Sequence, residues 1–262
     1  MERVVFGKTG LEVSPICYGS WQADERFWGA SDKNEHIDAM RRAVEVGVNF
    51  FDTADAYGRS EEVMGEALSS VPRDGIIITT KVFHNFKDRG GADIGDLSYQ
   101  GVIEHCEASL KRLRTDYVDI YLCHMFDRFT DIEETTRALD DLKKQGKIRH
   151  YGMSNFTAEE MRLACQVGDY EVVQPRFSFW RNETADDILP LARSLNMGVM
   201  AYSVLFKGLL TGKHTGDEKL ESRNPYLRGE VFKELAGRVR LLEPIAAKNN
   251  VSITQLVLAC VL

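Results

Sequence analysis

The sequence has no apolar run long enough to cross a membrane, no apolar signal segment at its N-terminus and no tract of basic residues. A membrane-spanning helix needs about 20 predominantly apolar residues, and the longest apolar-rich runs here, Tyr117–Cys123 and Leu256–Leu262, are far shorter. The net charge is −7, from 33 basic and 40 acidic residues, which disfavours binding to nucleic acid. We therefore expect a cytoplasmic protein whose partner is neither a membrane nor a nucleic acid.

Cysteine is scarce, and its spacing indicates neither disulfides nor a metal site. The five cysteines are scattered along the chain, and no C-x-x-C pair occurs among them. Scattered thiols of this kind are typical of a reducing cytosol. The H-E-x-x-H pattern and other ligand spacings of zinc sites are also absent. The sequence therefore predicts no metal site.

Glycine patterns that hold phosphate groups are missing as well. No G-x-G-x-x-G follows the first strand-like run, so the main marker of a doubly wound dinucleotide-binding fold is absent. The stretch GLLTGK at 208–213 is superficially like a phosphate loop, but its spacing is one residue short. His214 also stands where such a loop needs Ser or Thr. We reject the phosphate-loop interpretation.

What the 262-residue chain does contain is an alternation of short apolar runs with helical patterns. Parallel strands need crossover helices, so this alternation predicts a parallel sheet in an α/β fold. An open doubly wound sheet and a (β/α)8 TIM barrel both remain compatible with it. The predicted strands are Ile16–Gly19, Val48–Phe51, Ile76–Thr80, Tyr117–Cys123, Ile148–Met153, Glu171–Val173 and Met197–Ala201.

Helix boundary signals accompany the alternation. Thr130 with Glu133, and Thr157 with Glu160, have the spacing of capping boxes. Gly47 and Gly146 stand where helices end with glycine.

The two ends of the chain depart from the alternating pattern. Val4–Phe6 and Leu11–Val13, joined by Gly7-Lys8-Thr9-Gly10, predict an N-terminal β-hairpin that could close the bottom of a barrel. The last part, from Val231 to Leu262, is predicted to be helical.

Polar residues follow the ends of successive predicted strands. They are Asp52, Lys81, His124, Ser154 with Asn155, Gln174, and Tyr202 with Ser203. In a barrel these positions converge on the C-terminal rim, where barrel active sites lie. Each residue alone has an ordinary structural explanation, such as a turn former or a solvated cation. Their shared register at successive strand ends favours a functional site.

Tyr57, five residues after Asp52, adds a candidate proton donor. A free tyrosine has a pKa of about 10, and a cation within about 4–6 Å lowers such a pKa by roughly 1–3 units. Lys81 can be that cation, and Asp52 can keep the buried lysine charged. His124 can then hydrogen-bond and orient a carbonyl oxygen.

The chain resembles the aldo-keto reductase superfamily over essentially its whole length. The segments that carry the resemblance are GKTGLEVS at 7–14, FFDTADAYG at 50–58, ITTK at 78–81, LCH at 122–124, GKIRHYGMSNF at 146–156 and AYSVLFKGLLTGK at 201–213. The resemblance implies a (β/α)8 barrel that binds an extended nicotinamide cofactor without a Rossmann motif. We accordingly expect one aldo-keto-reductase-like barrel domain over residues 1–262.

The resemblance also implies roles for individual residues. Tyr57 is expected to be the proton donor, Lys81 and Asp52 to tune it, and His124 to position the substrate. The expected cofactor contacts are Gly19, Ser20, Trp21, Asp52, Ser154, Asn155, Gln174, Tyr202, Ser203, Leu205 and Gly208. The cofactor is expected to be NADP, with NAD as the alternative. The implied reaction is NAD(P)H-dependent reduction of an aldehyde or ketone to an alcohol, or the reverse oxidation, with hydride from the nicotinamide C4.

The family continues with an eighth strand and a last helix that binds the adenosine 2′-phosphate, and the printed chain stops at Leu262 before both. We expect either that Leu262 is not the natural end or that the protein is a truncated form. The residues that decide between NAD and NADP lie beyond that point, and nothing in the sequence indicates the oligomeric state.

The substrate is expected to be a small carbonyl or alcohol compound. Aromatic residues in or near the predicted rim loops suit apolar or aromatic carbonyls. They are Trp21, Phe27, Trp28, Phe83, Phe126 and Trp180. Two other functions stay open. The protein could be a cofactor-sensing regulatory subunit with little turnover, or a lyase that forms a Schiff base on Lys81.

Overall fold

The computed structural model describes residues 1–29, 31–83, 95–218 and 225–262, without the side chain of Phe27. Its contacts divide the chain into two compact units. The first unit comprises Met1–Gln174 and Ile188–Met200, and the second comprises Pro175–Asp187 and Ala201–Leu262. The expectation of a single barrel domain over the whole chain stays a prediction.

A seven-stranded parallel sheet forms the first unit, with its strands side by side in chain order. The strands are β3 (Tyr18–Gly19), β4 (Phe50–Asp52), β5 (Ile77–Val82), β6 (Val118–Cys123), β7 (Ile148–Ser154), β8 (Val172–Gln174) and β9 (Gly198–Val199). The seven predicted strands are thereby confirmed, with ends that shift by a few residues.

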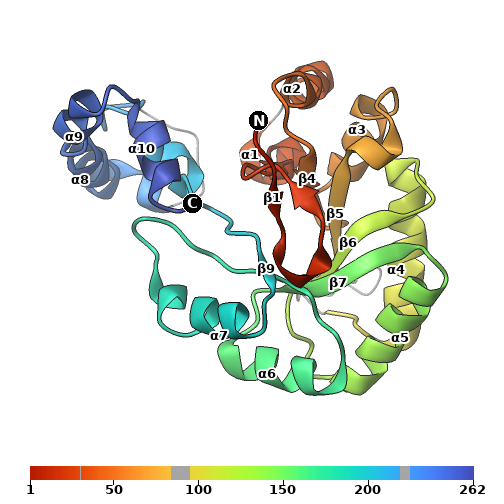
Figure 1. Cartoon of the computed structure of the whole chain (residues 1–262). Helices are drawn as coiled ribbons and strands as arrows, with labels where there is room; N and C mark the ends of the chain where they lie inside the picture. Colours follow the sequence, from red (N-terminus) through yellow and green to blue (C-terminus); the bar gives the residue numbers. More distant parts are fainter. Residues whose placement is uncertain (30, 84–94, 219–224) are drawn as a thin grey trace. The chain divides into compact units, whose positions relative to one another are not determined.

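Helices connect successive strands and lie along the outside of the sheet (Figure 1). They are α2 (Lys33–Glu45), α3 (Ser60–Ala67), α4 (Tyr99–Leu113), α5 (Ile132–Lys144), α6 (Ala158–Val167) and α7 (Ile188–Ser194). The unit also contains the short helix α1 (Glu25–Trp28) and the 3-10 turns η1 (Gly7–Thr9), η2 (Trp21–Ala23) and η3 (Arg73–Gly75). This strand–helix order is the crossover arrangement that a parallel sheet requires.

The sheet has an apolar core on each face. Successive strand residues point to opposite faces, so Ile77 joins the inner core and Ile78 the outer core. In β6, Ile120 likewise belongs to the inner core and Tyr121 to the outer core. The inner core fills the concave side, and the outer core packs the sheet against the helices. Asp52 lies two residues after the inward-facing Phe50, and its side chain therefore points inward as well.

The N-terminal hairpin packs against the inner core. Its strands β1 (Val4–Val5) and β2 (Glu12–Val13) are antiparallel. The Phe6 ring meets the Phe50 ring edge to face, with centroids 5.3 Å apart. Because Phe50 begins β4, this contact lies at the N-terminal end of the strands. The predicted hairpin is confirmed, and it covers the end of the core opposite to the polar strand ends.

Helix capping agrees with the sequence at Thr157 but not at Thr130. Thr157 and Glu160 form both bonds of a capping box at the start of α6. The residue that caps α5 is Asp131, whose side chain accepts the backbone N–H of Glu133 at 3.0 Å. The Thr130 hydroxyl instead donates to the buried carboxylate of Asp127 at 2.8 Å. The Thr130 capping box was therefore wrong, because a carboxylate one residue nearer the helix takes its place.

The second unit has a core of its own. Its elements are η4 (Glu183–Ala185), η5 (Phe206–Thr211), η6 (Pro225–Leu227), α8 (Gly229–Arg240), α9 (Glu243–Lys248) and α10 (Ile253–Ala259). Phe206, Leu210, Phe232 and Val257 are buried together in its core. The predicted helical tail is confirmed. It is divided into three helices, and Pro244 stands at the start of the second of them.

Candidate active site

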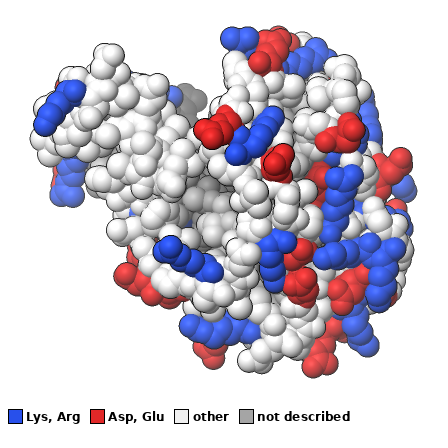
Figure 2. Space-filling model, viewed as in Figure 1, with Lys and Arg blue, Asp and Glu red and all other residues white. Residues whose placement is uncertain are grey.

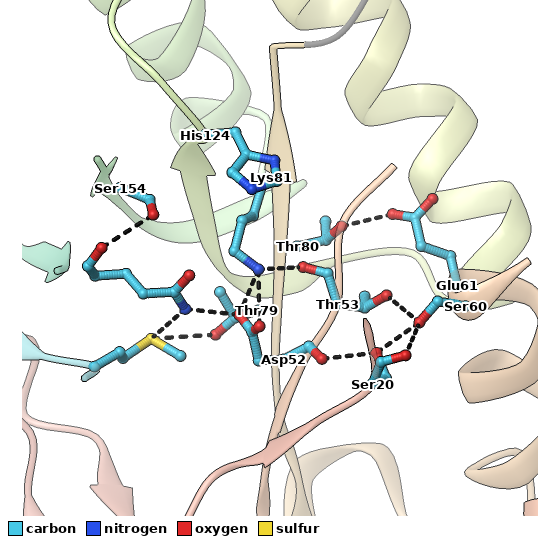
Figure 3. Close-up of polar contacts among 12 residues, drawn as sticks. Ser20, Asp52, Thr53, Ser60, Glu61, Thr79, Thr80, Lys81, His124 and Ser154 are labelled. Atoms are coloured by element: carbon cyan, nitrogen blue, oxygen red, sulfur yellow. Dashed lines mark hydrogen bonds and ion pairs between the residues drawn. The ribbon is translucent and has the colours of Figure 1, made fainter. Parts of the chain in front are cut away.

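The centre of the site is an ion pair between two inward-facing residues. The Lys81 ammonium lies 2.7 and 2.8 Å from the two carboxylate oxygens of Asp52 and donates to the Thr53 carbonyl oxygen at 2.6 Å (Figure 3). Asp52 pairs in register with Thr79, so Lys81 occupies the next inward position further along β5. A lysine is long enough to reach back to the carboxylate from there.

The surroundings of Lys81 keep it charged. Burial by itself lowers the pKa of a lysine, because the charged form loses its water. Here Asp52 and Tyr57 more than offset that cost, so the pKa of Lys81 lies above its ordinary value. All three ammonium protons have an acceptor in Asp52 and Thr53. The site therefore favours a buried cation at Lys81.

Tyr57 and His124 lie beside this cation. The Lys81 nitrogen is 4.9 Å from the centroid of the Tyr57 ring. The Tyr57 and His124 rings meet edge to face, with centroids 5.6 Å apart. His124 directly follows β6, and its backbone N–H donates to the Val82 carbonyl oxygen at 2.8 Å. A phenol, an ammonium, a carboxylate and an imidazole from three separate stretches of sequence thus come together at the strand ends.

A tight turn after β4 presents Tyr57 to the site. The Tyr57 backbone N–H donates to the Ala54 carbonyl oxygen at 3.1 Å, and the Tyr57 carbonyl accepts from the N–H of Ser60 at 3.0 Å. Gly58 has a left-handed φ of 57°. A Cβ atom at this position would also lie 3.2 Å from the carboxylate of Asp24. Glycine therefore allows the turn to close directly behind the tyrosine.

Hydroxyl groups secure the end of β4. The Ser20 hydroxyl donates to the Asp52 carbonyl oxygen at 2.8 Å and accepts from the Ser60 hydroxyl at 2.6 Å. Ser60 also lies 2.9 Å from the Thr53 hydroxyl. The sequence did not single out Thr53 and Ser60. Their small hydroxyl side chains, placed on either side of Tyr57, are the signal that could have found them.

The predicted polar residues of the next strands join the same network. The Gln174 amide donates to Asp52 at 2.9 Å, and the Ser154 hydroxyl donates to the Gln174 carbonyl oxygen at 3.0 Å. The Asn155 amide donates to the carbonyl oxygen of His124 at 2.9 Å. These amides and hydroxyls are the polar groups that suit a carboxamide ligand.

Two further expected cofactor contacts lie at the other side of Asp52. Gly19 pairs with Asp52 in the parallel ladder between β3 and β4. The Trp21 ring lies 6.1 Å from the Tyr57 ring and 5.4 Å from the Trp28 ring, measured between centroids. Trp21 and Trp28 therefore form an aromatic edge beside Tyr57.

The other aromatic residues expected at the rim lie in different parts of the structure. Phe126 packs against Phe156, and Phe83 is buried in the outer core. Trp180 packs on Phe206 inside the second unit. The side chain of Phe27 lies outside the described residues.

The remaining expected cofactor contacts, Tyr202, Ser203, Leu205 and Gly208, belong to the second unit. Near them are two cations that the sequence did not single out. The Arg176 Nε atom is buried and has no hydrogen-bond partner among the described residues. Burial, and then the charge of Arg176, lower the pKa of Lys207. Two neighbouring cations with an unsatisfied buried N–H suit an anionic ligand such as a pyrophosphate.

The part of the chain that the structure describes has neither a cluster of metal ligands nor a membrane-spanning helix. Within residues 1–29, 31–83, 95–218 and 225–262, no three His, Cys, Asp or Glu side chains are grouped so as to hold a metal ion. No helix in the same ranges is both long and apolar enough to span a bilayer. Figure 2 shows acidic and basic side chains interspersed over the face in view.

Comparison with known proteins identifies the family. A profile of the Aldo/keto reductase family matches residues 15–262. The chain belongs to this family. The glycerol dehydrogenase AKR11B4 of Gluconobacter oxydans superimposes with a TM-score of 0.82 at 31% identity, over 93% of this chain and 77% of that structure. This likeness to a solved member of the family confirms the predicted TIM-barrel fold class.

Curated relatives include an enzyme and a channel subunit. The aldo-keto reductase YhdN of Bacillus subtilis is 34% identical over 255 residues, covering 94% of this chain and 76% of its own length. A probable voltage-gated potassium channel subunit beta of Oryza sativa is 34% identical over 280 residues, covering 99% and 83%. The family and its reductase members support an oxidoreductase that acts on small carbonyl compounds.

Proposed function

We propose that the protein is an NAD(P)H-dependent oxidoreductase that reduces an aldehyde or ketone to an alcohol, or catalyses the reverse oxidation. The observation that carries this proposal is the buried Lys81–Asp52 pair beside the Tyr57 ring, with His124 at the edge of the same ring. Family membership supports the reaction class, and the geometry supports Tyr57 as its proton donor.

Each polar side chain has a distinct task in the proposed reaction. His124 hydrogen-bonds the substrate oxygen and orients it toward Tyr57. The Tyr57 hydroxyl gives its proton to that oxygen, and the Lys81 ammonium stabilises the negative charge left on the phenol. Asp52 offsets the burial that by itself lowers the pKa of Lys81, and so favours its charged form.

The nicotinamide cofactor, when bound, supplies the hydride from its C4 atom. We assign its carboxamide to Ser154, Asn155 and Gln174, and further contacts to Gly19, Ser20, Trp21 and Asp52. In the second unit we assign contacts to Tyr202, Ser203, Leu205 and Gly208. The unsatisfied Arg176 Nε atom supports an anion in that unit. NADP is the proposed cofactor, with NAD as the alternative.

A regulatory role is the second candidate, because the similarity to a channel subunit extends over 99% of this chain. A cofactor-sensing subunit would keep the same site but turn over slowly. The Schiff-base alternative is disfavoured, because an ion-paired lysine with a raised pKa stays protonated and is a poor nucleophile.

The test is a titration with NADPH and NADH against a panel of aldehydes and ketones, followed by the absorbance of the reduced nicotinamide. We expect carbonyl-dependent loss of that absorbance with at least one cofactor. Tight cofactor binding with negligible turnover across the panel would favour the regulatory role. Failure to bind either cofactor would contradict both proposals.

A further inference from the structure

A second polar pair lies close to the active-site turn, formed by Asp55 and His105. Asp55 belongs to the turn between Asp52 and Tyr57, and its carboxylate is 2.7 Å from Nδ1 of His105 on α4. The Asp55 side chain is only 3% exposed and that of His105 is 21% exposed. His105 is the only hydrogen-bond partner of the Asp55 side chain among the described residues, and the other carboxylate oxygen, Oδ1, is buried without one. A single bond therefore holds this carboxylate.

Charged groups from several elements surround the pair. Glu61 of α3 is buried near Asp55, and it is paired with Arg112 of α4 at 2.5 Å. Asp96, which precedes α4, also acts on His105. The buried phenol of Tyr121, on β6, is close enough for Asp55 to act on it. Among these described groups, the carboxylates of Asp55 and Asp96 favour the protonated form of His105, and Arg112 opposes it.

Neighbouring residues of β5 connect the two faces of the sheet. Thr80 donates to the carboxylate of Glu61 at 2.6 Å, whereas Lys81, the next residue, contacts Asp52 and Thr53 (Figure 3). The charge cluster around Asp55 thus lies one strand residue away from the catalytic lysine.

Three side chains that can carry a positive charge contact the turn that carries Tyr57. Lys81 donates to the Thr53 carbonyl oxygen at 2.6 Å, and Arg26 donates to the carbonyl oxygen of Ala56. His105 holds the residue between them, Asp55. Lysine and arginine keep their charge at neutral pH, whereas histidine titrates there. Of these three contacts, the one made by His105 is therefore the one that changes with pH near neutrality.

We infer that His105 is a positioning residue for the proposed reaction, which holds the Tyr57 turn in place through Asp55. The inference rests on the proposed function. His105 touches neither Lys81 nor His124 in the described contacts, so it acts through the backbone of the turn. The bond to Asp55 raises the pKa of His105 despite its partial burial, which favours the charged imidazole. The contact between His105 and Asp55 therefore weakens as pH rises through the pKa of His105.

The experiment compares His105→Ala, His105→Gln and His105→Arg with a matched control, His150→Ala. His150 makes a similar bond, at 2.9 Å to Glu171, but it lies near the N-terminal ends of β7 and β8, whereas the site lies at their C-terminal ends. The measurements are kcat and KM for benzaldehyde with NADPH, the Kd of NADPH by fluorescence, and thermal unfolding. His105→Gln replaces His105→Ala if the latter does not fold.

We expect His105→Ala to lower kcat on the order of 10- to 100-fold, the loss typical of a slightly misplaced catalytic group. The Kd of NADPH should change little, and His105→Arg should recover most of kcat because it restores the cation. In the wild type kcat should fall as pH rises through the pKa of His105, and this fall should be absent in His105→Arg. His150→Ala should keep the wild-type kcat.

Three results would overturn the inference. They are an unchanged kcat in whichever of His105→Ala and His105→Gln folds, an equal loss in His150→Ala, or a wild-type pH profile in His105→Arg. Failure of the proposed function looks different, because the wild type itself would then bind NADPH without turning over benzaldehyde or any other carbonyl of the panel. That result would remove the inference together with the function on which it rests.

Discussion

The two ends of the parallel strands hold carboxylates that are paired with cations in contrasting ways. At the N-terminal end, Asp119 accepts from Arg73 at 2.7 Å, from Arg149 at 3.1 Å and from the backbone N–H of Ile78 at 3.0 Å. Both guanidinium groups also stack on the Tyr117 ring, 4.0 and 4.1 Å from its centroid. At the C-terminal end, Asp52 is paired with a lysine that lies beside a phenol and an imidazole.

Under the proposed function, this difference separates a stabilising cluster from a reactive one. Arginine does not lose its proton in proteins, so the Asp119 cluster has no proton to exchange. Asp119 is fully buried, whereas Asp52 keeps 14% of its side chain exposed next to Tyr57. Barrel proteins use the C-terminal ends of strands for chemistry and the N-terminal ends for stability. Both clusters follow that rule, and mutations should separate them.

Replacement of Lys81 by methionine should have the largest effect on turnover. The variant removes the buried cation beside Tyr57 but keeps most of the side-chain volume. We expect kcat to fall on the order of 1,000-fold, within the range that general acid–base catalysis contributes. Initial rates of NADPH oxidation with benzaldehyde measure this loss. A Lys81→Met variant with more than half of the wild-type kcat would contradict the assignment of the reaction to the C-terminal ends of the strands.

Replacement of Asp119 by alanine should act on stability instead. It leaves two guanidinium groups and the Ile78 N–H without their acceptor, which should cost about 2–4 kcal/mol of unfolding free energy. Urea denaturation followed by circular dichroism measures the change. Below the unfolding transition the variant should keep the wild-type kcat. A large loss of kcat in the folded variant would show that the N-terminal end also serves the reaction.

A smaller effect concerns pH and the bond between His105 and Asp55. The pKa of His105 is raised in the folded protein, so its contribution to stability is full below the ordinary histidine pKa and is lost as pH rises through the folded value. Below the ordinary histidine pKa, we expect the free energy of unfolding of the wild type to exceed that of His105→Gln by about 1 kcal/mol. This difference should shrink as pH rises through the folded-state pKa of His105. Urea unfolding of both proteins across that pH range tests the sign. A difference that grows with pH would contradict the assignment.

The sequence predicted the strands and the inner residues of the site better than the supporting contacts. β-branched and apolar runs bounded by polar residues mark strands, and strand register then brings Asp52, Lys81 and His124 to one rim. No comparable pattern links Asp55 to His105, because the two are joined only by the packing of α4 on the outer face. The Thr130 cap failed for a local reason, since the adjacent Asp131 competes for the same helix end.

The assignment of Tyr57 as proton donor is the central claim, and a Tyr57→Phe variant tests it most directly. Phenylalanine keeps the ring that packs between Trp21 and His124 but lacks the hydroxyl. Turnover of NADPH with benzaldehyde should fall on the order of 1,000-fold or more, while the Kd of NADPH, measured by fluorescence, stays near the wild-type value. A Tyr57→Phe protein that reduces benzaldehyde at the wild-type rate would contradict the account.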